Sequence, residues 1–267
     1  MKMKKHLFKI FTLSLCFALC VSAVACKKAE FPTQDDTKYI AHRGYSNANV
    51  DNTEAAYLEA STLDFYGIET DVKVTKDGYY VCNHDDTAVF EDGTELVVKN
   101  STRAELLEKR LKGATKDTEY MCTFERYLEI CKESQKVAII EFKTEFTDAQ
   151  IEEIFEIVNT VYTLEKAVVI DFDFGQIKRA KQINDSIPYQ YLIGFPNFIN
   201  IDYALKNGIN LSFNKTVLNI FPGYIKRAHK NGLEVGVWTL DDKQEIANFI
   251  DMGVDYVTSN EFYGNFN

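Results

Sequence analysis

The sequence contains few side chains that bind metals through sulfur or nitrogen. Of its 267 residues, six are cysteine and four are histidine. Three of the cysteines precede residue 27, so only Cys82, Cys122 and Cys131 remain for a folded domain. They are odd in number and lack the spacing of a zinc site, and a disulfide framework is not indicated. We therefore expect these three cysteines to be small buried residues.

Basic residues are also in deficit. The chain has 30 Lys and Arg against 40 Asp and Glu, which gives a formal net charge of −10. Removal of residues 1–25 would take away four lysines and no acids and leave a net charge near −14. Such an acidic domain argues against nucleic acid or an anionic surface as a partner. It suits a site that holds its own cation.

The sequence also lacks an apolar run of membrane-spanning length. The run Ile10–Ala25 has 16 residues, which is short against the roughly 20 that a spanning helix needs. It follows four lysines and leads through small residues into Cys26, the layout of a bacterial lipoprotein signal. We predict a signal peptide over 1–25 and a lipid-modified Cys26 at the start of a polar tether over 26–38. The protein would then be exported and lipid-anchored to the outer face of the bacterial cell membrane. A plain signal peptide and an uncleaved anchor are the alternatives.

Internal repeats are absent, and so is the glycine-rich phosphate loop that an open doubly wound sheet normally has after its first strand. Instead, short β-branched runs alternate with amphipathic patterns over residues 39–267, a length that suits one large core. Eight strands alternating with helices predict a single (βα)8 TIM-type barrel in the α/β class. The expected strands are 39–42, 68–72, 137–141, 167–171, 189–193, 209–212, 234–238 and 256–258. The expected helices are 53–65, 123–133, 148–162, 174–184, 200–207, 220–231 and 242–252.

One connection is too short for a parallel crossover, which needs a dozen or more residues. The second strand, 68–72, is followed almost at once by the apolar run 79–84, with Asp77-Gly78 between them. We predict an antiparallel hairpin with Asp77-Gly78 as a two-residue turn. In that register Asp71 faces His84, and Glu69 lies one step away on the same face. The more polar residues 86–122 would form a small insertion after this hairpin.

Charged side chains follow the predicted barrel strands, where catalytic groups of such barrels lie. Three carboxylates that converge on one mouth would repel one another without a cation, and oxygen ligands select Mg²⁺ or Ca²⁺. Two histidines in the same region could act as acid and base. Two basic side chains could neutralise charge on phosphate oxygens. His229, by contrast, is read as structural, because it lies near a helix end. The predicted metal ligands are Glu69, Asp71 and Glu141, the catalytic residues are His42 and His84, and the phosphate-binding residues are Arg43 and Lys143.

These residues stand in motifs that resemble the glycerophosphodiester phosphodiesterase family. The motifs are Ile40-Ala41-His42-Arg43-Gly44, Asp51-Asn52-Thr53, Gly67-Ile68-Glu69-Thr70-Asp71, Asn83-His84-Asp85, Glu141-Phe142-Lys143 and Trp238-Thr239. The resemblance implies that Trp238 lines the substrate pocket. Three positions depart from the family pattern: Asp51 stands for glutamate, Asp171-Phe172 for Ser-Phe, and Ser259-Asn260 for Thr-Asp.

The resemblance implies metal-dependent hydrolysis of a glycerophosphodiester to sn-glycerol 3-phosphate and an alcohol. The sequence leaves open which histidine is the acid, whether a cyclic phosphate forms first, and how many chains associate. Two other functions remain as alternatives. One is a phospholipase D-like enzyme acting on lysophospholipid or sphingolipid head groups. The other is a surface lipoprotein that binds phosphodiesters without turnover.

Overall fold

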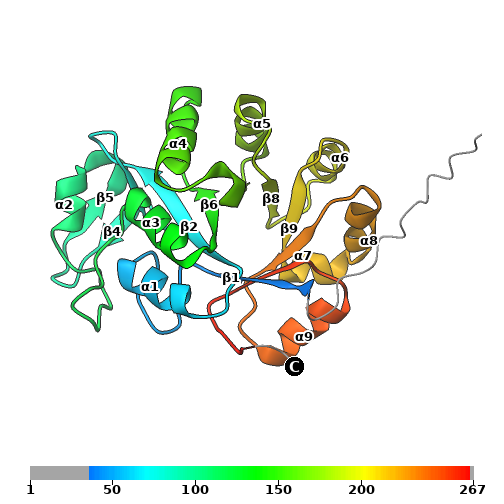
Figure 1. Cartoon of the computed structure of the whole chain (residues 1–267), viewed down its shortest axis with the longest axis horizontal. Helices are drawn as coiled ribbons and strands as arrows, with labels where there is room; N and C mark the ends of the chain where they lie inside the picture. The colour runs from blue at the N-terminus through cyan, green and yellow to red at the C-terminus, as the bar shows by residue number, and fades with distance from the viewer. Residues whose placement is uncertain (1–35, 265–267) are drawn as a thin grey trace, which may run out of the picture.

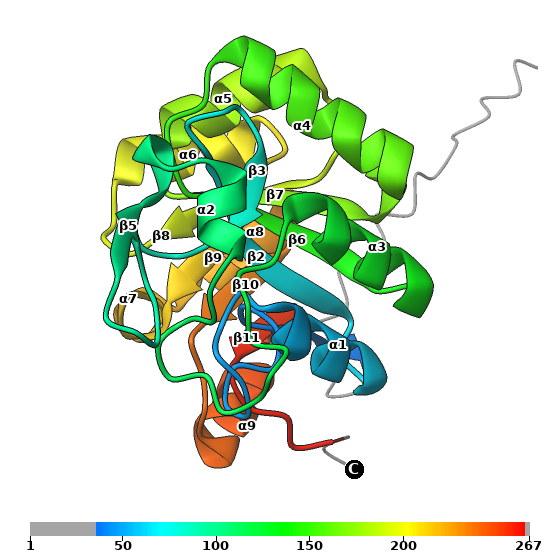
Figure 2. The ribbon, with the colours of Figure 1, turned by 90° about the vertical axis from the view of Figure 1, so that its left-hand side faces the viewer.

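Eight parallel strands close into a barrel in the computed structural model, which describes residues 36–264 (Figures 1 and 2). Pairing of the first strand with both the last and the second closes the sheet. The (βα)8 prediction is therefore confirmed. The predicted signal peptide, Cys26 and most of the tether lie outside the described residues. The barrel strands in sequence order are β1 (Lys38–Ala41), β2 (Gly67–Val74), β6 (Val137–Phe142), β7 (Ala167–Asp171), β8 (Tyr189–Ile193), β9 (Asn210–Asn214), β10 (Val235–Trp238) and β11 (Tyr256–Ser259).

Helices follow the barrel strands and pack around their outer side. Threonine side chains cap several of them; for example, Thr53 accepts a hydrogen bond from the Ala56 amide in the first turn of α1. No helix within residues 36–264 is long and apolar enough to cross a bilayer. The helices of the barrel are α1 (Glu54–Thr62), α3 (Phe124–Ser134), α4 (Asp148–Val161), α5 (Phe174–Ile183), α6 (Phe198–Lys206), α7 (Lys215–Ile220), α8 (Gly223–Lys230) and α9 (Lys243–Asp251), with a short 3-10 helix η3 (Leu164–Lys166) before β7.

The single helix expected over 220–231 is wrong in its boundaries. The structure has two helices there, α7 and α8, separated by Phe221 and Pro222. Asn214, at the end of β9, caps α7 by accepting a hydrogen bond from the Thr216 amide. Pro222 has no amide hydrogen to continue α7, so a new helix begins after it.

The predicted hairpin between β2 and β3 (Tyr80–Cys82) is present, but its register differs by one residue. Val72 pairs with Cys82, so Asp71 lies opposite Asn83 and not His84. The turn has three residues, Lys76 to Gly78: the Gly78 amide donates to the Thr75 carbonyl, and Gly78 has φ +86°. A three-residue turn that ends in a left-handed glycine is a common hairpin form. The Asp-Gly dipeptide fits both turn types, and sequence alone did not distinguish them.

The insertion at residues 86–122 is a small layer beside the barrel (Figure 2). A two-stranded sheet of β4 (Thr87–Val89) and β5 (Glu95–Val97) is followed by η2 (Val98–Asn100) and α2 (Arg103–Leu107). Its apolar side chains form a cluster around Phe90 and Leu106 that also includes Val81 of β3. This small core therefore packs the insertion against the hairpin.

Two apolar clusters support the barrel, and polar groups occupy its mouth, the end at which the strands have their carboxyl ends. A large cluster fills the space between the strands and the helices, and includes the free and buried Cys82, Cys122 and Cys131, as expected. A smaller cluster inside the barrel includes Ile40, Ile139 and Tyr256. Side chains farther along the same strands point into the mouth, at the carboxyl ends of the strands.

Candidate active site

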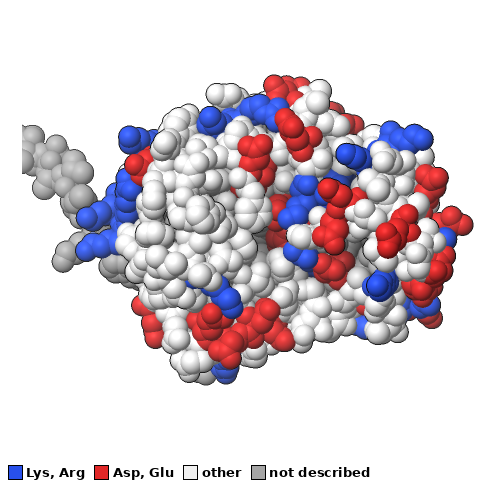
Figure 3. Space-filling view, turned by 180° about the vertical axis from the view of Figure 1, so that it is seen from behind, with Lys and Arg blue, Asp and Glu red and all other residues white. Residues whose placement is uncertain are grey.

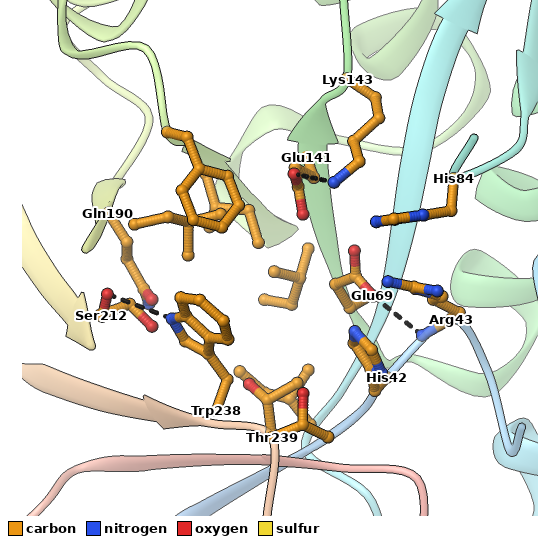
Figure 4. Close-up of a pocket in the computed structure, with 16 residues that line it drawn as sticks. His42, Arg43, Glu69, His84, Glu141, Lys143, Gln190, Ser212, Trp238 and Thr239 are labelled. Atoms are coloured by element: carbon orange, nitrogen blue, oxygen red, sulfur yellow. Dashed lines mark hydrogen bonds and ion pairs between the residues drawn. The ribbon is translucent and has the colours of Figure 1, made fainter. Parts of the chain in front are cut away.

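A pocket opens at the mouth of the barrel, and most of the predicted site residues line it (Figure 4). Asp71 is the exception: it is fully buried beside the pocket and contacts residues that line it. The lining side chains come from all eight barrel strands or the segments that follow them, and from the segment after β3. They are Ile40, His42, Arg43, Glu69, His84, Ile139, Glu141, Lys143, Ile170, Phe172, Gln190, Leu192, Ser212, Trp238, Thr239 and Thr258.

Three buried carboxylates meet at one side of this pocket. Glu69 and Asp71 alternate along β2 and therefore share a face, and Asp71 is directly beside Glu141 on β6. One oxygen from each of the three lies within 4.8 Å of the others. Their exposed fractions are 2%, 0% and 7% in sequence order. Parallel pairing of β2 and β6 thus brings together acids that are 70 residues apart in the chain.

This acid cluster is short of positive charge. Glu69 Oε1 and Asp71 Oδ1 are buried and accept no hydrogen bond. Burial raises the pKa of Glu69 well above its ordinary value, and the carboxylates of Asp71 and Glu141 raise it further. Burial likewise raises the pKa of Glu141, to about 7. Orphaned carboxylate oxygens in one cluster fit a hard divalent cation, which binds oxygen ligands and restores the charge balance.

Arg43 and Lys143 border the acid cluster. The Arg43 guanidinium forms ion pairs with Asp51 at 2.9 Å and Asp71 at 3.1 Å, and its amide donates to Glu69 Oε2. Lys143 Nζ lies 2.7 Å from Glu141 Oε1 and 3.7 Å from Asp71 Oδ1. Both cations are therefore close to where a phosphate on the predicted metal would lie. Asp51, one of the departures from the family pattern, holds the Arg43 side chain.

His42 is oriented by a chain of hydrogen bonds that the sequence did not predict. His42 Nδ1 lies 2.7 Å from Asn260 Oδ1. The Asn260 amide group donates to Asp241 Oδ2 at 2.8 Å, and Ser46 Oγ donates to Asn260 Oδ1. Because these bonds define Oδ1 as the acceptor end of Asn260, His42 Nδ1 carries the hydrogen. Its Nε2 is then free to accept a proton. Burial and the neighbouring Arg43 lower the pKa of His42, which favours the neutral ring.

His84 lies beyond the end of β3, on the same side of the pocket as His42 and Arg43 and across from Trp238 (Figure 4). Its ring is 36% exposed, and Nδ1 lies 2.8 Å from Asp85 Oδ1. The predicted pairing opposite Asp71 is wrong, because of the hairpin register. His84 nevertheless lines the pocket together with His42 and the acids. An adjacent carboxylate can accept from Nδ1 while Nε2 holds a second proton.

Asn52 is a further residue whose contribution the sequence did not reveal. Its Nδ2 donates to Asp71 Oδ2 at 2.7 Å, and its Oδ1 accepts from the Tyr57 hydroxyl and the Asp71 amide. Asn52 and Arg43 both have left-handed backbone, with φ of 58° and 56°. The Asn52 amide donates to the Arg43 carbonyl. This local fold fixes Asp71 and Arg43 relative to each other. The motif Asp51-Asn52-Thr53 was visible in the sequence, but nothing in it identified Asp71 as the partner.

Two aromatic side chains form part of the pocket wall. Trp238 lines the pocket, donates from Nε1 to the Ser212 carbonyl and makes an edge-to-face contact with Phe172, with ring centroids 5.4 Å apart. Asp171, the departure just before Phe172, does not line the pocket. It accepts hydrogen bonds from Gln176 and from the Asp173 amide, and burial raises its pKa to about 7. This charge therefore lies on the side of α5.

His229 is outside the pocket. It lies in the last turn of α8, and its Nε2 is 2.8 Å from Asp255 Oδ2. Asp255 also accepts from the Val235 amide at the start of β10. These contacts join α8 to the barrel at the end opposite the mouth.

Three kinds of group meet at the mouth of the barrel. They are acids that can hold a hard cation, basic side chains that can bind a phosphate, and two histidines that can transfer protons. This combination defines a metal-assisted phosphodiester hydrolase. The comparison with known proteins is more specific. The chain belongs to the glycerophosphoryl diester phosphodiesterase family, whose model matches residues 42–262. The protein is thus an enzyme of this family, which hydrolyses glycerophosphodiesters.

Individual relatives agree with this assignment. A glycerophosphodiester phosphodiesterase from Caldanaerobacter subterraneus is 27% identical over 230 residues, which cover 84% of this chain and 94% of the relative. The crystal structure of a glycerophosphodiester phosphodiesterase from Parabacteroides distasonis is 26% identical, with a TM-score of 0.71 over 84% of this chain and 93% of the other. An Oleispira antarctica phosphodiesterase, solved in complex with the product sn-glycerol-3-phosphate, has a TM-score of 0.76 at 20% identity and covers 86% of this chain and 93% of its own.

Proposed function

We propose that this enzyme hydrolyses glycerophosphodiesters to sn-glycerol 3-phosphate and an alcohol, with His42 and His84 as its acid–base pair. The observation that carries the proposal is the placement of both histidines in one pocket with the buried acid cluster. The same product is bound in the Oleispira antarctica phosphodiesterase of similar fold. Water is consumed, the bond between phosphorus and the alcohol oxygen breaks, and the alcohol leaves with a proton.

His42 is the proposed base. Its Nδ1–H is held by Asn260, so Nε2 can accept a proton from the glycerol 2-hydroxyl or from water as that oxygen attacks phosphorus. The lowered pKa of His42 keeps Nε2 unprotonated near neutral pH. Asp241 and Ser46 act through Asn260, because they fix the amide that orients the ring.

His84 is the proposed acid. With Asp85 at its Nδ1, its Nε2–H can donate to the departing alcohol oxygen. Arg43 and Lys143 lie where they can neutralise charge that develops on the phosphate oxygens. A Mg²⁺ or Ca²⁺ ion held by Glu69, Asp71 and Glu141 would supply Lewis-acid polarisation of a phosphate oxygen and an attacking hydroxyl. If the 2-hydroxyl attacks, a cyclic phosphate forms, and water then opens it with the two histidines in exchanged roles.

Trp238 and Phe172 are the proposed contacts for the substrate's alcohol group. Their rings are in edge-to-face contact, and Trp238 lies across the pocket from Glu69 (Figure 4). The face of such a ring attracts a quaternary ammonium group such as that of choline. This feature supports glycerophosphocholine as the first substrate to test.

A coupled assay of glycerol 3-phosphate release tests the proposed reaction. Purified enzyme with Mg²⁺ or Ca²⁺ should release glycerol 3-phosphate from glycerophosphocholine and glycerophosphoethanolamine. Release of choline from lysophosphatidylcholine, with no glycerol 3-phosphate from either glycerophosphodiester, would instead indicate the phospholipase D-like activity. Binding of these compounds without any product would indicate a phosphodiester-binding lipoprotein.

We also propose that the enzyme is exported and anchored to the outer face of the cell membrane by lipid on Cys26. The layout of residues 1–26 supports this, and the polar tether 26–38 would link the lipid to the folded domain. We expect the protein to partition with membranes and Cys26→Ala to prevent lipid attachment. Mass spectrometry of the mature N-terminal peptide measures this directly. An unmodified peptide that starts at another cleavage point would contradict the anchor and leave the site chemistry unaffected.

A further inference from the structure

The barrel mouth is bordered on one side by exposed apolar side chains. Phe195 is 85% exposed and Ile199 82%, both in or just before the first turn of α6. Ile220, at the end of α7, is 64% exposed, and Phe198 is 50% exposed. We call these four residues, Phe195, Phe198, Ile199 and Ile220, the apolar rim. A group of large apolar side chains with such high exposure on a folded protein marks a surface that contacts an apolar partner.

The two segments of the apolar rim are joined to each other and to the pocket. Both begin at the carboxyl ends of barrel strands, β8 and β9, and so lie at the mouth. The rings of Phe198 and Phe221 make an edge-to-face contact with centroids 5.6 Å apart, which connects α6 to the end of α7. Gly194, just before Phe195, lies against the rings of Phe172 and Trp238 in the pocket wall. The apolar surface therefore continues from the aromatic wall of the pocket to the outside.

Charge is absent from this part of the surface. The segments 194–201 and 216–225 contain no Lys, Arg, Asp or Glu. In the space-filling view, a broad area without charged side chains covers the left side of a hollow, and charged residues gather on the other side (Figure 3). An uncharged apolar face on a chain with a net charge of −10 is unsuited to an anionic partner and suited to uncharged or zwitterionic lipid.

We propose that the apolar rim docks the mouth of the barrel onto a lipid surface, with its four side chains among the acyl chains. Three observations favour lipid over a protein partner. The rim adjoins the mouth, through which substrate must enter. A folded protein bound there would cover the mouth, whereas mobile acyl chains would leave it open. The rim holds two Phe and two Ile, and none of the Tyr, Trp, Met and Arg that are enriched together with Phe in protein interfaces. The predicted lipid on Cys26 brings the domain to a bilayer.

This inference relies on the proposed function only for the position of the mouth, and its test does not need turnover. We compare Ile199→Trp with Leu58→Trp in the full chain. Leu58 is 39% exposed on α1, which follows β1, and β1 lies across the barrel from β8. Phosphatidylcholine vesicles with brominated acyl chains quench a tryptophan that enters the acyl region. The N-terminal segment brings both variants to the vesicles equally, and Trp238, the one tryptophan of the sequence, is the same in both.

We expect bromine to quench the added fluorescence of Ile199→Trp and to leave that of Leu58→Trp unchanged. In addition, Phe195→Ser/Ile199→Ser should lower turnover of a glycerophosphodiester whose alcohol carries an acyl chain, embedded in phosphatidylcholine vesicles, about 10-fold, with turnover of water-soluble glycerophosphocholine retained. Equal quenching of both variants, or none at residue 199, would overturn the proposal. Loss of glycerophosphocholine turnover in the double variant would also overturn it, because the rim would then belong to the pocket. A double variant in which only the oligomeric state in solution changes would overturn it too, because the rim would then be a contact between copies of the chain. If wild-type enzyme fails to hydrolyse glycerophosphocholine while residue 199 is quenched, the proposed function fails and the lipid surface stands.

Discussion

His42→Ala and His84→Ala are each expected to lower turnover of glycerophosphocholine by about 10²–10⁴-fold, the usual effect of losing a general base or acid. Both rings line the pocket and neither belongs to an apolar cluster, so the variants should keep the wild-type melting temperature. The measurement is kcat/KM from the coupled assay. His229→Ala is the matched control: His229 pairs with Asp255 away from the mouth, so its loss should affect stability and leave turnover unchanged. Near wild-type turnover in either pocket variant would remove that histidine from the mechanism.

Asn260→Asp separates the proposed role of His42 from that of His84. A carboxylate in place of the amide would stabilise protonated His42 and raise its pKa. Because the base must be neutral, the acidic limb of the kcat/KM profile should move to higher pH, whereas the wild-type limb reflects the lowered pKa of His42. The rate at alkaline pH should change much less. An unchanged acidic limb would show that His42 is not the base that this limb reports.

Chelation is expected to abolish activity, and Mg²⁺ or Ca²⁺ to restore it, because Arg43 and Lys143 leave Glu69 Oε1 and Asp71 Oδ1 in the cluster of three buried acids without a hydrogen-bond partner. Glu141→Gln should weaken metal affinity strongly, as measured by calorimetry, and should lower turnover by a comparable factor. Glu153→Gln is a suitable control, because Glu153 lies on α4, outside the pocket, and accepts a hydrogen bond from the hydroxyl of Tyr80 on β3. Full activity in exhaustively chelated protein would contradict the metal site.

The pH dependence of metal binding follows from the raised pKa of Glu69 and of Glu141, which is about 7. Protons and the cation compete for the same oxygens, so affinity should increase as pH rises from 5.5 to 8. The stability of the metal-free protein should depend on pH in the opposite direction. Acids whose pKa is raised in the folded state stabilise that state at low pH, and this contribution is lost as pH rises through about 7. Metal-free protein should therefore gain stability on acidification across this range, and thermal unfolding with and without metal measures both effects.

Most of the barrel could be predicted, because each barrel strand is a short apolar run and most of these runs are separated by segments with helical patterns. The strands 167–171 and 189–193 agree residue for residue with β7 and β8. The acids were found because their alternation on β2 fixes their common face. The hairpin register was not, because it depends on whether Gly78 closes a two- or a three-residue turn, a difference that both local sequences permit.

Contacts between distant residues account for the parts of the site that were missed. Asn260 and His42 are 218 residues apart, and only closure of the barrel between β1 and β11 brings them together. The Asn52–Asp71 bond likewise depends on where the β1–α1 segment folds against β2. Side chains that position a catalytic group carry no local pattern, whereas the group itself stands in a recognisable motif.

The left-handed backbone at Arg43 and Asn52 has a consequence for how this enzyme can be stabilised. Each such residue costs the folded state about 1 kcal/mol or more, because its Cβ crowds the backbone. Glycine at either position would relieve that crowding, yet it would remove the guanidinium beside Asp71 or the amide that holds Asp71. Loss of either partner of a buried ion pair or hydrogen bond costs more than the strain that glycine relieves, so a screen for thermal tolerance should reject glycine at both positions. Resistance to heat and turnover in this enzyme therefore depend on the same two side chains, and selection for the first also retains what the second requires.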